Sequence, residues 1–293
     1  GGGASGGGGG GVGDLLRAPG GAGGAGADGG AAGPPAGPPP FGPEGRLPPL
    51  GLPLVAGGGC LKQGPGGGWE RWPYSAFFCE ENALLLCRAL VERGRAPLHE
   101  LSVCFISNEA RRAPVWCQTK GRPVAGGLVF WDYHVVVVQA AAGRDPLVWD
   151  LDSTLPFPCA LARYAREALH EELWLPAADS RSSALPPELQ PRFRVVPGAL
   201  FARHFASDRS HMRLADGSWE APPPPYPPVS GQDGVAMNLG RYTAMADSSP
   251  LDGRFGRVFT FAGLARQFER LAGPAGPALP EIPGVKPASR RVK

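Results

Sequence analysis

The segment over residues 128–138 restricts the fold of this chain more than any other part of the sequence. It reads LVFWDYHVVVV, and its β-branched and aromatic residues are typical of a buried β-strand. His134 lies in the middle of this apolar run. A buried imidazole without a hydrogen-bond partner is costly, so we expect a polar partner for His134 close by in the fold.

Asp150 is the first candidate for that partner. It belongs to a second short strand, residues 147–151, which follows a loop with Gly143 and Asp145-Pro146. If the two strands form an antiparallel hairpin centred near Ala142, His134 faces Asp150. A buried histidine beside a buried aspartate is two-thirds of a catalytic triad.

Two other carboxylates compete with Asp150 for this role. Asp132 lies two positions before His134 and so shares its strand face. Asp152 shares the face of Asp150, and a one-step shift of the hairpin centre would bring it opposite His134. Asp145 is expected in the turn instead.

Cys79 is the candidate nucleophile. The apolar spacing predicts a helix over residues 79–93, with Gly94 as its C-cap. Cys79 would open that helix, where free amide groups and the helix dipole stabilise a thiolate. A cysteine at a helix start, followed by strand-borne His and Asp, is the arrangement of papain-like hydrolases and also of transglutaminases.

Glu80 and Glu81 follow the cysteine directly and have two interpretations. They would be favoured by the dipole in a solvated first turn, but carboxylates beside Cys79 would also raise the pKa of its thiol. A sharper interpretation is that a carboxylate receives a cationic group of the substrate. His211 is a second candidate base, although its neighbours suggest a loop hydrogen-bond network. No cysteines or histidines have the spacing of a zinc site, so we expect neither a metal nor a cofactor.

The composition divides the chain into three parts. Residues 1–68 are dominated by Gly, Ala and Pro and are expected to be disordered, as is a flexible basic tail over residues 273–293. Residues 69–272 are expected to form one domain of about 200 residues. The further expected elements are strands over 101–106, 115–116, 193–196 and 258–261 and helices over 160–174, 199–205 and 262–271. This order of elements, with antiparallel pairing, predicts the α+β class with an antiparallel sheet packed against helices.

Charge and hydropathy exclude several classes of partner. The net charge is +3 without a basic stripe, and no segment approaches the about 18 apolar residues of a membrane span, so neither nucleic acid nor membrane binding is expected. The six cysteines form no Cys-x-x-Cys pair and are expected to be reduced thiols, which points to the cytoplasm or nucleus. Nothing demands an oligomer, so a monomer is expected. The proline-rich residues 222–228 are expected to run extended along the surface.

Several segments together resemble a known family. Residues 131–135 read WDYHV, 79–82 read CEEN, 105–109 read FISNE, 150–152 read DLD and 205–212 read FASDRSHM. These segments are similar to those of the WDYHV-motif family of N-terminal glutamine amidohydrolases. The similarity covers residues 70–271 and leaves out the Gly-rich lead.

The resemblance implies a cysteine amidohydrolase with a papain- or transglutaminase-like fold. Members convert the N-terminal Gln of proteins and peptides to Glu with release of ammonia, the first step of the Gln branch of the arginine N-degron pathway. Carried over by motif, Cys79 is the nucleophile, His134 the base and Asp150 the orienting acid.

Substrate-binding residues are less defined by the resemblance. Tyr74-Ser75 matches the Tyr-Ser pair before the family's nucleophile, which makes Tyr74 a candidate, whereas residues 76–78 (AFF) depart from the usual spacer. Glu80, Glu81 and Asp132 are the candidates to pair with the free α-ammonium. The alternatives are a papain-like peptidase or transglutaminase, and a non-catalytic scaffold that binds partners through the proline-rich segment.

Overall fold

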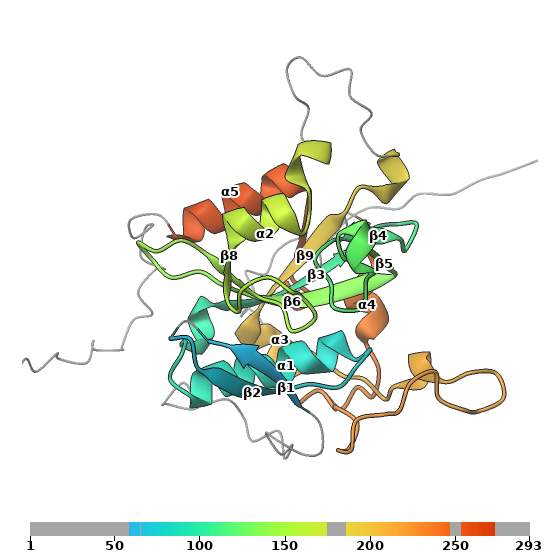
Figure 1. Ribbon diagram of the computed structural model, residues 1–293. Coiled ribbons are helices and arrows are strands. Elements are labelled where there is room, and N and C mark those ends of the chain that lie inside the picture. Colours follow the sequence, from blue (N-terminus) through green and yellow to red (C-terminus); the bar gives the residue numbers. More distant parts are fainter. Residues whose placement is uncertain (1–58, 65, 175–185, 247–252, 273–293) are drawn as a thin grey trace, which may run out of the picture. The chain divides into compact units, whose positions relative to one another are not determined.

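A six-stranded antiparallel sheet runs through the centre of the structure, in the order β10-β9-β3-β6-β7-β8 (Figure 1). The computed structural model describes residues 59–64, 66–174, 186–246 and 253–272, and all statements below refer to these. The strands are β3 (Leu101–Ser107), β6 (Tyr133–Gln139), β7 (Leu147–Trp149), β8 (Cys159–Ala160), β9 (Arg192–Pro197) and β10 (Arg257–Phe259). All five pairings between neighbours are antiparallel.

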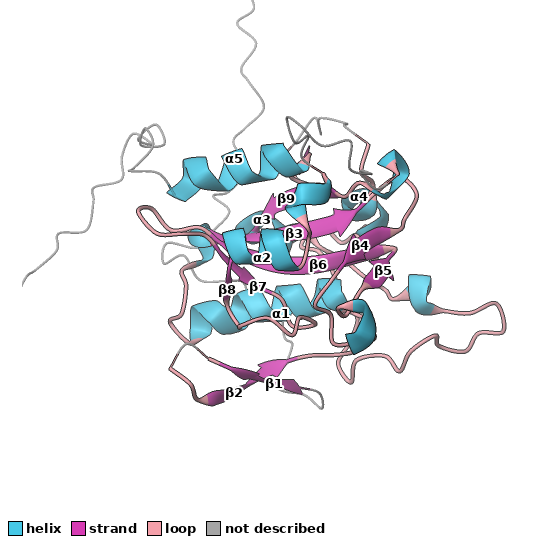
Figure 2. Ribbon diagram, turned by 45° about the horizontal axis from the view of Figure 1, so that its top comes forward, coloured by secondary structure: helices cyan, strands magenta, loops and turns pink. Residues whose placement is uncertain are grey.

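Helices cover both faces of this sheet. On one side lie α1 (Cys79–Glu92), α3 (Gly198–His204) and α4 (Leu239–Thr243), and on the other lie α2 (Leu161–Glu167) and α5 (Phe261–Ala272) (Figures 1 and 2). The short 3-10 helices are Leu98–Glu100, Pro123–Ala125, Glu171–Leu173, Pro187–Leu189 and Ser210–Met212. None of the helices in the described ranges is long and apolar enough to cross a membrane.

The valine run of β6 supplies apolar side chains to both faces. Val135 and Val137 pack into the cluster that contains α1, whereas Val136 and Val138 pack into the cluster that contains α2 and α5. Successive side chains of a strand point to opposite faces, so a strand between two helical layers needs apolar residues at every position. The continuous run in the sequence is therefore explained by the two-sided cover.

The predicted strand over residues 128–138 is wrong as a single element. Val129–Trp131 forms β5 and pairs with β4 (Ala113–Val115) in a separate two-stranded sheet, while β6 begins at Tyr133. Asp132 forms the bend between them: its carboxylate accepts the N–H of Tyr133 at 2.9 Å, and its carbonyl accepts the hydroxyl of Ser107 at 2.5 Å. These local hydrogen bonds satisfy the polar groups at the break.

The segment expected to be disordered also needs a correction. Gly59–Gln63 forms β1, which pairs with β2 (Trp69–Pro73) outside α1 (Figure 2). The ordered domain therefore begins before Trp69. Residues 1–58 and the tail 273–293 lie outside the described residues.

The remaining expectations agree with the structure except for one helix and the bounds of two strands, since β4 ends at Val115 instead of Trp116 and β10 ends at Phe259, two residues before the expected end. The helix over 79–93 and the strand over 101–106 are confirmed to within a residue, while the C-cap residue is Arg93 and the expected Gly94, with φ +63°, follows it. The strand and helices expected over 193–196, 199–205 and 262–271 are also present. The helix predicted over 160–174 is wrong, because α2 ends at Glu167 and His170 adopts a left-handed φ of 48°. The α+β class with an antiparallel sheet packed between helices is confirmed.

Candidate active site

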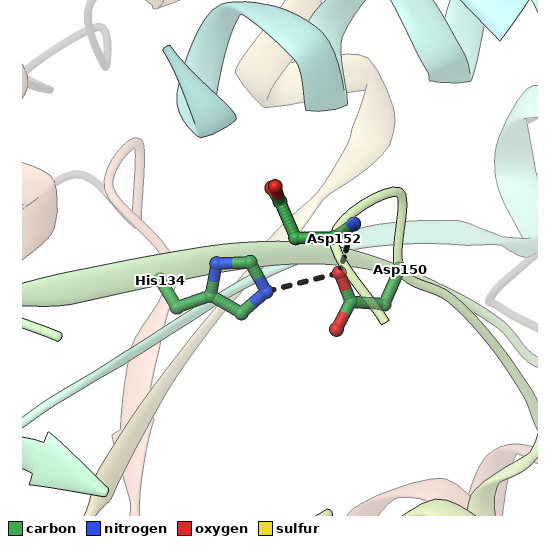
Figure 3. Close-up of side chains that lie close together, drawn as sticks. All are labelled: His134, Asp150 and Asp152. Atoms are coloured by element: carbon green, nitrogen blue, oxygen red, sulfur yellow. Dashed lines mark hydrogen bonds and ion pairs between the residues drawn. The ribbon is translucent and has the colours of Figure 1, made fainter. Parts of the chain in front are cut away.

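His134 is fully buried in β6, and one ring nitrogen is directed at Asp150 (Figure 3). The distance from His134 Nε2 to Asp150 Oδ1 is 3.0 Å. Trp131 stacks on the imidazole with ring centroids 4.9 Å apart and planes inclined by 17°. The second ring nitrogen, Nδ1, is buried and has no hydrogen-bond partner. The imidazole is thus held by Asp150 and by Trp131 and left with one ring nitrogen to act on another group.

Only donors surround the Asp150 carboxylate. Oδ1 accepts from His134 and from the backbone N–H of Asp152 at 2.9 Å. Oδ2 accepts from Gln118 Nε2 at 3.1 Å and from the Tyr164 hydroxyl at 2.9 Å. Burial alone would raise the pKa of Asp150, but the charge of His134 and these hydrogen bonds lower it below its ordinary value. The carboxylate is therefore held ionised.

Asp150 in turn acts on the imidazole. Burial lowers the pKa of His134, but the charge of Asp150 and its hydrogen bond outweigh burial and raise the pKa above its ordinary value. Because the carboxylate accepts from Nε2, the neutral ring carries its proton on Nε2 and presents Nδ1 as a base. This is the protonation pattern that a general base requires.

The predicted hairpin register is wrong, although it paired the right residues. Val137 faces Trp149 and Val138 faces Val148, so the hairpin is shifted by one step from the predicted register. If both strands continued in this register, Asp152 would lie opposite His134. β7 ends at Trp149, however, and the chain turns over residues 150–152. That turn carries the Asp150 carboxylate to the ring.

Asp152 is committed to other groups. Its Oδ1 accepts from Tyr74 OH at 2.6 Å and from Lys120 Nζ at 2.5 Å. The Lys120 ammonium also lies over the rings of Tyr74, Phe77 and Trp131, at 5.6, 4.8 and 5.2 Å from their centroids. The Tyr74 hydroxyl therefore binds Asp152 next to the His134–Asp150 pair, and in this structure Tyr74 supports the position of that aspartate.

A metal ion is the other use that His134, Asp150 and Asp152 suggest. One ligand atom from each lies within 4.8 Å of the others. Each of these carboxylates, however, already accepts hydrogen bonds from neutral or cationic donors, and the Lys120 ammonium neutralises Asp152. Such donors already occupy the carboxylate oxygens and would compete with a cation.

Cys79 opens α1 as predicted, but the expected thiolate stabilisation is not found. Burial raises the pKa of its thiol, and Glu80 and Asp152 add to this effect. A hydrogen bond from the backbone of Val135, the residue after His134, lowers the pKa of the thiol. The same contact places the thiol beside β6, beyond the end of β7. Within the described residues no hydrogen bond joins Cys79 to His134, and the thiol donates to Glu80 Oε2 at 3.8 Å. The thiol is therefore protonated near neutral pH.

A pocket of about 180 Å³ opens onto Cys79. Its lining includes Cys79, Trp131, Asp132, Tyr133, His211 and Glu220. Sequence reasoning placed His211 in a loop network, and the structure brings it into this pocket instead. The walls are aromatic and polar, with two carboxylates beside Arg111 and His211, which suits a short polar substrate chain.

The three carboxylate candidates for substrate binding have different surroundings. Glu81 is fully buried, and Arg209 takes both of its oxygens at 2.8 Å, so it is not available to a ligand. Asp132 is about half exposed at the pocket and pairs with Arg111 at 3.0 Å. Glu80 is fully buried behind the pocket and has one oxygen without a hydrogen bond.

Several contributing residues had no local signal in the sequence. Gln118, Tyr164 and Lys120 hold the acids of the site, and Arg209 neutralises Glu81. Each is distant in sequence from its partner and is brought to it only by the fold.

Comparisons with known proteins point to one family. A family described as N-terminal glutamine amidase matches residues 74–268. The chain is similar to a protein N-terminal glutamine amidohydrolase of Arabidopsis thaliana, with 47% identity over 185 residues, which covers 62% of this chain and 79% of the relative. The relatives of the same name from Homo sapiens and Danio rerio are each 36% identical over 195 residues, or 67% of this chain and 87% and 88% of the relatives.

Proposed function

The chain belongs to the N-terminal glutamine amidase family, and we propose that it hydrolyses the side-chain amide of N-terminal Gln in proteins and peptides. The products are N-terminal Glu and ammonia. The observation that carries this proposal is the His134–Asp150 pair, which leaves Nδ1 of His134 free. The next residue of the same strand, Val135, contacts the Cys79 thiol through its backbone. This arrangement supplies a nucleophile, a base and an orienting acid in one place.

The first step forms a tetrahedral intermediate, which becomes a thioester when ammonia leaves. Cys79 Sγ attacks the side-chain carboxamide carbon of Gln while the thiol proton moves to His134 Nδ1. Because the pKa of the thiol is raised, proton removal accompanies the attack instead of preceding it. The backbone N–H of Cys79, in the first turn of α1, has no acceptor within the helix and can donate to the developing oxyanion.

Ammonia then leaves and water replaces it. The imidazolium of His134 donates its proton to the departing nitrogen as the C–N bond breaks. His134 next takes a proton from water, whose oxygen attacks the γ-glutamyl thioester. The C–S bond breaks, the sulfur regains a proton from His134, and the γ-carboxylic acid of Glu is released. Asp150 keeps the imidazole in one tautomer and stabilises its protonated form throughout.

The finer fold assignment is also a proposal. A helix that starts with the nucleophile packs against an antiparallel sheet that carries the histidine, and the aspartate follows the next strand. This arrangement supports a papain- or transglutaminase-like fold. We further propose that the protein acts as a monomer in the cytoplasm and nucleus. The free thiols of all six cysteines support a reducing compartment, which fractionation of cells and light scattering of the pure protein would test.

Ammonia release tests the reaction directly. The substrates are a Gln-initiated peptide, its Nα-acetylated form and a peptide with the same Gln at an internal position. We expect release only from the first, and equal rates on all three would refute N-terminal specificity. Peptide-bond cleavage or transfer of the acyl group to an added amine would identify the peptidase or transglutaminase alternative.

A pair of cysteine variants tests the nucleophile. Cys79→Ala should abolish ammonia release. Cys87→Ala is the matched control, because Cys87 lies on the same helix and burial raises the pKa of its thiol to about 12. It should retain activity. An active Cys79→Ala variant would remove Cys79 from the mechanism. The scaffold alternative would be favoured if deletion of the proline-rich residues 222–228 abolished binding of partner proteins and left ammonia release unchanged.

A further inference from the structure

A second histidine–carboxyl pair lies beside the thiol, apart from His134 and Asp150. His211 Nε2 is 3.6 Å from Glu80 Oε1. Tyr133 OH connects them, since it donates to Glu80 Oε2 at 3.1 Å and lies 3.4 Å from His211 Nε2. Tyr133 and His211 line the pocket together with Cys79, and Glu80 lies directly behind them.

Two atoms of this pair have unused hydrogen-bonding capacity. Glu80 Oε1 and His211 Nδ1 are both buried without a hydrogen-bond partner. Glu80 itself has no exposed surface. A buried carboxyl oxygen without a hydrogen-bond partner is costly, which makes Glu80 a candidate to bind a polar group.

The charge state of the pair follows from its burial. Burial raises the pKa of Glu80 to about 8, and the neighbouring Glu81 contributes to the rise. Burial also lowers the pKa of His211 below its ordinary value. Near neutral pH both groups are therefore mainly uncharged.

We propose that Glu80 and His211 form the site that receives the α-amine of N-terminal glutamine. This inference rests on the proposed function and deepens it. Glu80 Oε2 lies 3.8 Å from Cys79 Sγ. In glutamine the amine and the reacting carbon are four bonds apart, about 5 Å in extended form, so both can be reached from one bound residue.

Proton transfer makes the site selective. A free α-amine has a pKa of about 7.7–8.0, close to that of Glu80. An amine that enters uncharged takes the proton of the Glu80 carboxyl, and the product is an ammonium–carboxylate pair without any exchange with solvent. The nitrogen of an acetylated or internal residue is an amide and cannot accept this proton. Asp132 is less suited, because Arg111 already neutralises it at the exposed rim.

The test compares two substrates that differ only in the amine. One is a Gln-initiated peptide, and the other is the same peptide in which a glutaramic acid residue replaces Gln and so lacks the α-amine. The readout is the ratio of their kcat/KM values, because a merely structural defect lowers both values and leaves the ratio unchanged. In Glu80→Gln and His211→Asn we expect the ratio to fall about ten- to a hundredfold, the usual value of a hydrogen bond to a charged group.

Asp132→Asn is the matched control, since it removes a carboxylate from the same pocket. It should keep the ratio within twofold of the wild type. The proposal is overturned if Glu80→Gln and His211→Asn keep the wild-type ratio, or if only Asp132→Asn loses it. Should Glu80→Gln fail to fold, His211→Asn carries the test, because the His211 side chain is partly exposed. A wild-type protein that releases no ammonia from the Gln peptide would refute the proposed function itself, and that result is visible without any variant.

Discussion

Replacing Asp150 by Asn changes the polarity of the group that His134 depends on. All four hydrogen bonds into the carboxylate come from donors, two on each oxygen. An amide has only one oxygen, so its NH₂ group must face either Gln118 and Tyr164 or the imidazole. In the second orientation the NH₂ donates to His134 Nε2 and moves the ring proton to Nδ1, where the base is needed.

The size of the effect follows from these contacts. Loss of a hydrogen bond to the charged imidazolium costs about 1.5–3 kcal/mol, or about 10- to 150-fold in rate. The wrong tautomer adds to this, and the same change in a serine protease triad lowers kcat by about 10⁴. We therefore expect kcat of Asp150→Asn to fall about 10²- to 10⁴-fold. An unsatisfied buried donor costs about 1–3 kcal/mol of stability, which leaves the domain folded.

Steady-state ammonia release at saturating Gln peptide measures kcat, and urea unfolding measures stability. Asp152→Asn is the control, because Asp152 binds Tyr74 and Lys120 through its side chain instead of the imidazole. Its kcat should fall less than tenfold. A kcat for Asp150→Asn within threefold of the wild type, or a larger loss in Asp152→Asn, would refute the assignment of the orienting acid.

Three further perturbations test the structure around the site. Arg209→Ala leaves the buried Glu81 carboxylate unpaired and should lower the free energy of unfolding by about 3–5 kcal/mol in urea titrations; a loss below 1 kcal/mol would contradict this. The pKa of Glu80 is raised from 4.5 to about 8, so the folded protein holds this proton more tightly than the unfolded chain. The contribution of Glu80 to stability is therefore full below pH 4.5 and is lost as the pH rises to about 8. Wild type should thus lose stability relative to Glu80→Gln between pH 5 and 8 (roughly the interval between the two pKa values), and parallel pH profiles would disprove it. In Gly121→Ala the new Cβ would lie 2.2 Å from backbone atoms across its turn, so thermal stability and kcat should both fall, whereas Gly66→Ala, with nothing within 4 Å, should melt like the wild type.

Local patterns were enough to predict the elements that carry the site. The spacing of apolar residues located α1 and placed Cys79 at its start, and the valine run identified the central strand with His134. Both signals are periodic and depend on neighbours within a few residues. They indicate which face of a helix or strand is buried, and the structure buries the same faces.

The features that the sequence could not predict depend on the course of the chain. Periodicity does not detect the bend at Asp132 or the end of β7 at Trp149, and so the register was one step out even though the His134–Asp150 pair was right. The expectation of a stabilised thiolate at Cys79 failed for a similar reason. The helix start favours a thiolate locally, but burial against β6 outweighs it.

The Glu81–Arg209 ion pair also sets an order of events during synthesis. Its two residues are 128 positions apart, and both side chains are almost completely buried. At a translation rate of 5–20 residues per second, Glu81 emerges from the ribosome roughly 6–26 s before its counter-charge has been made. A nascent chain that ends before Arg209 contains Cys79, His134 and Asp150 but holds an unneutralised acid in the first turn of α1. We therefore expect the arrangement around Cys79 to be completed only after Arg209 has been made.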